Sequence, residues 1–142
     1  MAITRQQTQV QWTGANIKTV NSAAEVVSDL ITLDPTCVGL SVSLYANNAN
    51  STPASGDTAV WRIQWSAGDV RADTGDDFDT SEHAQYLTTL DTYSTNVPGE
   101  NPAQRTIIVD VVAQKFKIAV TCANAATRNV TVSARIEEQR AA

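Results

Sequence analysis

Apolar and polar side chains alternate along four segments of the chain, which is the period-two pattern of a strand with one buried face. These segments are Val38–Tyr45, Ala59–Ala67, Lys115–Cys122 and Asn129–Glu137. In the second segment Trp61, Ile63 and Trp65 share one face, and the residues between them are polar. The pattern therefore predicts four strands whose apolar faces, including these two tryptophans, form a common core.

Three further segments predict strands less directly. Residues 1–12, and Ile3–Trp12 in particular, are rich in Thr, Gln and Val, which suits an N-terminal arm or an edge strand. The apolar spacing of Ala24–Leu33 fits either a helical turn or a bulged strand, and we favour the strand. Arg105–Ala113 is apolar on nearly both faces, which is typical of a central strand or of a strand that contacts another chain.

The connections between these strands complete the prediction of the fold. Residues 66–96 form a connection of about thirty residues, a length at which loops are uncommon and often functional. Within it, Ser81–Leu87 can form a short helix capped by Thr80 or Ser81. The polar end Glu137–Ala142 is expected to fray.

Because no helix is long enough to connect parallel strands, the sheets should be antiparallel. We therefore expect an all-β protein with a single domain over residues 1–142, an antiparallel β-sandwich or jelly roll of about seven or eight strands. Thr, Ser and Asn together exceed a quarter of the chain, which agrees with a protein of strands and turns.

The charge balance excludes one class of partner and the hydropathy another. The chain has 10 basic and 15 acidic residues, and the basic ones are scattered, so we expect no nucleic-acid binding. No apolar stretch reaches the ~20 residues of a membrane-spanning helix, so no membrane partner is expected. The N-terminus lacks the apolar core of a signal peptide, which predicts synthesis and folding in the cytoplasm unless another route exports the chain.

The two cysteines, Cys37 and Cys122, are too few for a disulfide framework. We favour two buried free thiols, with a single bridge as the alternative. With the one histidine, they match no zinc motif, and no cofactor is expected.

An acidic cluster spans Asp69 to Glu82 and includes the candidate metal ligands Asp73, Asp76, Asp77 and Asp79. Hard cations such as Ca²⁺ often take several oxygens from one loop, but the spacing does not match a helix–loop–helix calcium site. A solvated loop extended by charge repulsion is therefore favoured over a cation site or a contact with a basic neighbour.

Catalysis has little support in the sequence. His83 lies beside Ser81 and Glu82, but a catalytic triad depends on convergence in space, and no nucleophile-elbow pattern is present. A small hydrolase using His83 and the acidic cluster remains an alternative, as does a glycosidase with a carboxylate pair from Asp57, Asp69, Asp73 and Glu82. We expect no catalytic residues and no enzyme.

Candidate interface residues come from the strand with two apolar faces. Ile108 and Val112 lie opposite Ile107, Val109 and Val111, so one of the two rows must leave the core unless the strand is covered on both sides. Exposed apolar rows mark interfaces. The alternative is a central strand covered by the 66–96 connection.

Aromatic residues provide a second set of candidates. Trp12 follows a polar segment and fits either the core or an interface, and we include it among the interface candidates. As an alternative function, Trp12, Tyr45, Tyr86 or Tyr93 could form an exposed platform of a carbohydrate- or receptor-binding module.

Finally, the chain resembles the small β-sandwich virion proteins of tailed bacteriophages. The resemblance lies in the start Met1–Arg5, the run Trp61–Asp69, and the two segments Lys115–Cys122 and Asn129–Ile136. It implies a non-enzymatic virion protein, most simply a capsid decoration or cement protein that binds between major capsid subunits. It also implies a homo-oligomer, often a trimer. A collar or a tail or fibre component is the alternative, and the resemblance transfers no functional residue.

Overall fold

The computed structural model describes residues 2–48, 57–66, 84–91, 103–123, 125 and 129–141, and these contain no helix. The acidic cluster Asp69–Glu82, with its candidate metal ligands, lies outside the described residues, as do His83 and Tyr93. The described residues form ten strands: β1 (Ile3–Gln9), β2 (Lys18–Val20), β3 (Val26–Val27), β4 (Ile31–Thr32), β5 (Cys37–Asn48), β6 (Thr58–Trp65), β7 (Ala84–Asp91), β8 (Ala103–Val109), β9 (Lys115–Cys122) and β10 (Val130–Ala141).

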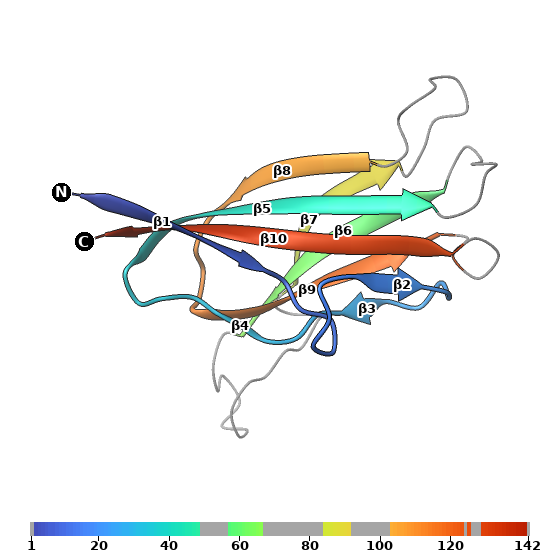
Figure 1. Ribbon diagram of the computed structural model, residues 1–142, viewed down its shortest axis with the longest axis horizontal. Coiled ribbons are helices and arrows are strands. Elements are labelled where there is room, and N and C mark those ends of the chain that lie inside the picture. Colours follow the sequence, from blue (N-terminus) through green and yellow to red (C-terminus); the bar gives the residue numbers. More distant parts are fainter. Residues whose placement is uncertain are drawn as a thin grey trace.

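The strands form two antiparallel sheets packed face to face (Figure 1). The first sheet has the order β1-β10-β5-β8, with β2 also pairing with β10 beyond the end of β1. The second has the order β3-β9-β6-β7, with β4 also pairing with β9. Since β1 and β2 occupy one row, and β3 and β4 another, each sheet has four rows.

The order of these eight rows defines a jelly roll. The row of β1 and β2 pairs with β10, the row of β3 and β4 pairs with β9, β5 pairs with β8, and β6 pairs with β7. This is the pairing of one long antiparallel ribbon folded on itself. The added pairs β5–β10 and β6–β9 roll that ribbon into two sheets. The prediction of an antiparallel sandwich of the jelly-roll type is confirmed, and the strand count is higher because two rows are interrupted.

The core lies between the sheets and consists of the apolar faces predicted by the alternation. From the first sheet it contains Val42 and Leu44 of β5 with Val132 and Ile136 of β10, all at most 2 % exposed. The second sheet contributes the following buried residues: Trp61, Ile63, Trp65, Phe116, Ile118 and Val120. The rings of Trp65 and Phe116 are in contact, with centroids 4.9 Å apart.

Trp12 belongs to this core, so its assignment as an exposed interface residue was wrong. It is 2 % exposed, and its ring meets that of Trp61 edge-on at a centroid distance of 6.3 Å. The backbone turns back between Trp12 and Ala15, and Thr13 and Gly14 have positive φ angles of 52° and 78°. The Asp29 carboxylate accepts hydrogen bonds from the backbone N–H groups of both turn residues. This turn places the indole between the sheets.

The segment 24–33 is a strand with an interruption, as favoured from the sequence. Its two short strands pair with opposite halves of β9. Between them, Ser28 accepts a hydrogen bond at its side-chain oxygen from the N–H of Ile118, and the N–H of Asp29 bonds to the Gln11 carbonyl. Side-chain and loop hydrogen bonds thus replace ladder bonds where the strand is broken.

The expectation of one long connection over 66–96 was wrong because β7 lies inside it. Residues 84–87, assigned to a possible helix, belong to this strand, and Ala84, Gln85 and Tyr86 pair with β6. The position of β7 beside β8 of the other sheet also closes one side of the sandwich. Thr88 faces inward from β7 and accepts a hydrogen bond of 2.7 Å from the Arg105 guanidinium on β8. Tertiary pairing therefore overrides a weak helical pattern.

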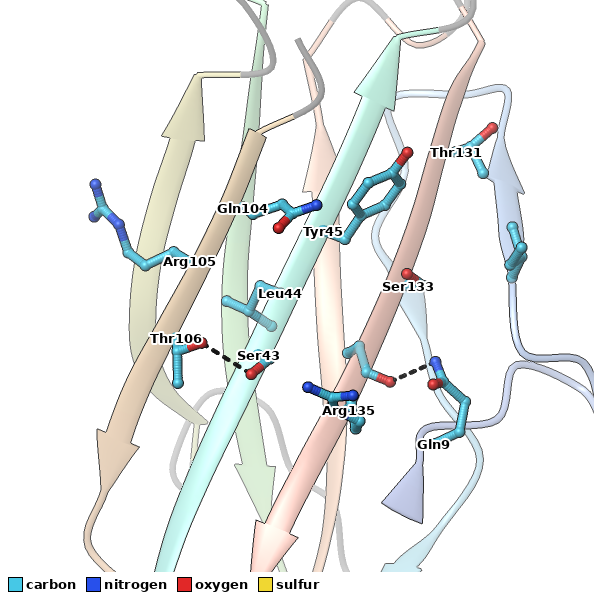
Figure 2. A pocket seen from close by; sticks show the side chains of 12 residues that line it. Gln9, Ser43, Leu44, Tyr45, Gln104, Arg105, Thr106, Thr131, Ser133 and Arg135 are labelled. Carbon is cyan, nitrogen blue, oxygen red and sulfur yellow. Dashed lines mark hydrogen bonds between the residues drawn. The ribbon is translucent and has the colours of Figure 1, made fainter. Parts of the chain in front are cut away.

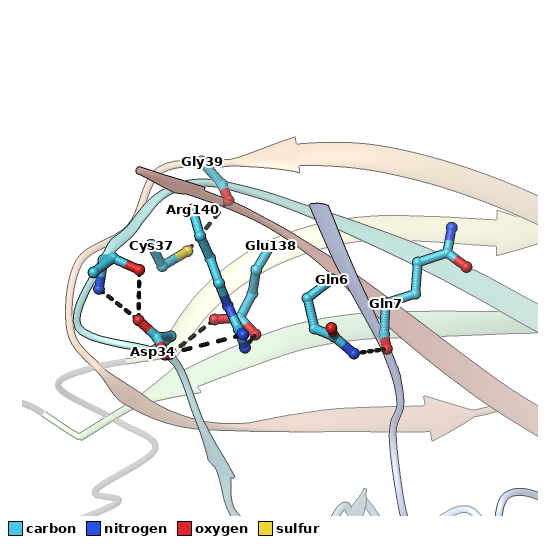
Figure 3. Close-up of polar contacts among 8 residues, drawn as sticks. Gln6, Gln7, Asp34, Cys37, Gly39, Glu138 and Arg140 are labelled. Atoms are coloured by element: carbon cyan, nitrogen blue, oxygen red, sulfur yellow. Dashed lines mark hydrogen bonds and ion pairs between the residues drawn. The ribbon is translucent and has the colours of Figure 1, made fainter. Parts of the chain in front are cut away.

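The chain's C-terminal segment does not fray, contrary to expectation. It continues β10 to Ala141, which pairs with Ile3, so both termini lie at the same end of the sandwich (Figure 1). Glu138 points inward and is 2 % exposed. Its carboxylate accepts one hydrogen bond from the Asp34 N–H at 2.8 Å and another from Arg140 at 2.7 Å (Figure 3). Two charge-assisted bonds thus satisfy a buried carboxylate.

Asp34, at the turn before β5, completes this network. Its carboxylate accepts hydrogen bonds from both the hydroxyl and the N–H of Thr36, which lower the pKa of Asp34. The N–H of Ala141 bonds to the Thr36 carbonyl at 2.9 Å. The turn and the end of β10 therefore hold one another in place.

Truncating the core should destabilise the fold far more than truncating its surface. Phe116→Ala is expected to lower the free energy of unfolding by ~3–5 kcal/mol, because it removes a fully buried ring from between the sheets. Urea denaturation measures this. The control Tyr86→Ala, at a position 59 % exposed on the second sheet, should cost less than ~1 kcal/mol. Equal effects of the two substitutions would contradict the assigned core.

Candidate functional site

The solvent-facing side of the first sheet, here called the outer face, gathers polar residues from four strands. Strand register places them in rows across β8, β5, β10 and β1. The first row consists of Ile108, Ser41, Glu137 and Gln7. The second consists of Thr106, Ser43, Arg135 and Gln9. The third consists of Gln104, Tyr45 and Ser133. These are the residues between the buried positions of the alternating segments.

Hydrogen bonds tie part of this face together. The hydroxyl groups of Ser43 and Thr106 lie 2.9 Å apart, and Gln9 donates to the carbonyl of Ala134 at 2.9 Å. Glu137 accepts a hydrogen bond from Gln7 at 3.0 Å, and Arg5 lies 3.9 Å from the same carboxylate. The carboxylate of Glu137 is therefore already paired with side chains of the edge strand β1.

A groove of about 460 Å³ runs over the second and third rows (Figure 2). Its floor includes Ser43 and Ser133, whose short side chains leave space between longer neighbours. Figure 2 shows the Tyr45 ring beside Gln104, with Arg135 farther along β10. Ile17, which is 59 % exposed, lines the groove near β2. Sequence reasoning treated these polar positions only as the solvent faces of strands and missed the groove.

Ile108 and Val112 are exposed, as the pattern of Arg105–Ala113 allowed. Ile108 is 88 % exposed and Val112 is 65 % exposed. The alternative of a central strand covered by the 66–96 connection was wrong, because Ile108 is exposed and β8 is the last of the described strands in its sheet. Val111, in the row opposite Ile108 and Val112, is 39 % exposed, since β8 ends at Val109 and the chain then crosses to the second sheet.

A third exposed aliphatic residue, Val38, lies at this end of the sandwich and is 61 % exposed. Leu40 pairs with Val109, so residues just before Leu40 lie at the same end of the sheet as residues just after Val109. Val38 and Val112 are such residues. We call Val38, Ile108 and Val112 the apolar end.

The remaining aromatic candidates are separated in space. Tyr45 lies on the outer face of the first sheet, and Tyr86 lies on the opposite side of the molecule, on the solvent side of the second sheet. The hydroxyl of Tyr86 bonds to that of Thr89. With Trp12 buried, the described tyrosines and tryptophans do not form one platform.

The described ranges bring together no set of side chains for catalysis or metal binding. Within them, no three His, Cys, Asp or Glu side chains are close enough to hold a metal ion. Cys37 and Cys122 are free thiols, the first half-buried and the second fully buried. Burial raises the pKa of Cys122 to about 12, so the reactive thiolate is suppressed there at neutral pH.

Comparison of the sequence with protein-family models and with curated proteins finds no match. In the part of the chain that the structure describes, no helix is long and apolar enough to cross a membrane.

The buried thiol should be protected from alkylation. With a pKa of about 12 in the folded protein and ~8.5 when unfolded, Cys122 should react with iodoacetamide at pH 8 at least ~100-fold more slowly in the native state than in denaturant. Because the fold favours the neutral thiol of Cys122, this thiol contributes less to the free energy of unfolding as the pH rises above ~8.5. Mass spectrometry of the labelled peptides measures the rate, and Cys37, which is partly exposed, should label first. Fast native labelling of Cys122 would contradict its burial.

Proposed function

We propose that this chain is a non-enzymatic structural protein of a tailed-bacteriophage virion, a capsid decoration or cement protein that binds between major capsid subunits. The exposure of Ile108 is the observation that carries the proposal. The jelly roll adds support of a general kind, because capsid domains use it, but lectins and cupins use it too. The argument therefore depends on the surface of the molecule.

Ile108 exposes 88 % of its surface, the highest fraction among the large hydrophobic side chains of the described residues. Full burial of an isoleucine side chain contributes ~1.5–3 kcal/mol, and Val38 and Val112 add apolar surface at the same end. A neighbouring subunit that covers the apolar end gains this free energy on assembly. In the isolated chain the same residues remain in water.

The edge position of β8 favours the same partner. An edge strand presents unpaired backbone N–H and C=O groups, which a neighbouring chain can approach. A second copy of this chain or a capsid subunit would cover the edge and the apolar end together. A threefold arrangement closes such contacts without leaving a copy uncovered. An ordinary contact of this kind buries ~800 Å² per partner.

The mechanism is mechanical. The two terminal strands of the sandwich pair with one another, and the bond between Glu138 and Arg140 holds the C-terminal strand. The described chain therefore has no loose terminus on the side that carries the apolar end. Such a module stabilises a shell by burying area on two neighbours at once, which opposes their separation. A collar or tail position would use the same contact.

Replacing the central residue of the apolar end should disrupt association. In sedimentation velocity at micromolar concentration, the wild-type chain is expected to exceed the 15.2 kDa monomer, and Ile108→Glu should weaken association at least ~10-fold by placing a charge in the contact. Ile17→Glu is the matched control, since Ile17 is also exposed but lies near β2, away from the apolar end.

The virion assignment needs a second measurement. Particles of the phage that encodes the chain are purified on a density gradient, and the particle band should contain the chain in a fixed ratio to the major capsid protein. A monomer in solution that is also missing from the particle band would overturn the proposal.

A further inference from the structure

The groove on the outer face is independent of the apolar end and has a different chemistry. Its side chains are hydroxyl, amide, phenol and guanidinium groups, contributed by three adjacent strands and by Gln9. Its volume of about 460 Å³ lies within the usual range of small-molecule sites. A site of this composition recognises a ligand by hydrogen bonds, with one aromatic ring for an apolar face.

Four of these polar side chains have no partner among the described residues. Tyr45, Gln104, Ser133 and Arg135 make no side-chain hydrogen bond or ion pair in the described structure. The other described arginines are all engaged: Arg5 with Glu137, Arg62 with Glu25, Arg105 with Thr88 and Arg140 with Glu138. Arg135 is thus the one guanidinium of the described chain without a partner, and it lines the groove.

The order of the side chains along the groove matches one kind of ligand. In the third row the Tyr45 ring lies between Gln104 and Ser133, and Arg135 follows in the second row, two residues along β10 from Ser133. A sugar ring has an apolar C–H face, which stacks on an aromatic ring, and a rim of hydroxyl groups, which amides and hydroxyls bind. If the sugar carries a carboxylate beside its ring, that carboxylate would accept two parallel hydrogen bonds from the guanidinium of Arg135.

From this geometry we infer that the outer-face groove binds an acidic saccharide, with a sugar ring on Tyr45 and its carboxylate on Arg135. Glu137, the carboxylate of the same face, does not compete for Arg135, because it is bonded to Gln7 and lies beside Arg5. A nucleic acid does not fit, since its phosphates require several clustered cations and the groove has one unpaired arginine.

Titration of the ¹⁵N-labelled full chain tests the inference. The probes are two matched pairs of tetrasaccharides, each with an acidic and a neutral member. In the first pair a tetrasaccharide of glucuronic acid is compared with one of glucose, and in the second a tetrasaccharide of galacturonic acid is compared with one of galactose. Amide shifts are expected around Ser43–Tyr45, Gln104–Thr106 and Ser133–Arg135. In at least one pair, the acidic member should bind about tenfold more tightly than its neutral counterpart, as expected for one charge-assisted contact.

Variants separate the two parts of the site. Arg135→Gln should reduce the affinity for the acidic sugar about tenfold, to that of the neutral one, without changing neutral binding. Tyr45→Ala should weaken both. Arg62→Gln, the same change on the second sheet and away from the groove, should change neither. Equal binding of acidic and neutral sugars by the wild type would overturn the role of Arg135, and no groove shifts at ~10 mM of any probe would overturn the site.

Discussion

The constraint on which the whole structure depends is the burial of alternate side chains from β5 and β10 against those of β6 and β9. Each of these strands has its apolar face at the other sheet, and Val42, Trp61, Ile118 and Val132 are completely buried. A strand cannot slip by one residue without turning this face to water. The register that follows also determines which residues lie outside, so the same constraint places both the groove and Ile108.

The sequence predicted this framework well because the buried faces follow a strict period of two. It failed where residues are held by contacts distant in the chain. The Thr-rich strand β7 has no strong alternation and forms because β6 provides a partner. Trp12 follows a polar strand, and only the turn fastened by Asp29 carries its ring into the core. In the sequence Glu138 belongs to a polar C-terminal segment, yet Arg140 and the Asp34 N–H satisfy its carboxylate in a buried position.

The candidate surfaces were predictable to different degrees. Ile108 stands out in the sequence because Arg105–Ala113 is apolar on nearly both faces, although only the sheet order shows that β8 is the last of the described strands in the first sheet. The groove could not be found from the sequence, because it depends on three strands that are distant in the chain. Ser43, Gln104 and Arg135 come from separate segments and become neighbours only through the register of β5, β8 and β10. Under the two proposals, the apolar end serves assembly and the polar outer face serves recognition.

Hydrogen–deuterium exchange of the isolated chain tests most directly whether packing between the two sheets holds the fold together. The amides of β5, β6, β9 and β10 are expected to be the slowest, exchanging only when the whole domain unfolds. Those of β1 should exchange at least ~100-fold faster, since β1 pairs with β10 alone and every residue from Ile3 to Thr8 is exposed. Exchange in β6 and β9 as rapid as in β1 would contradict the account.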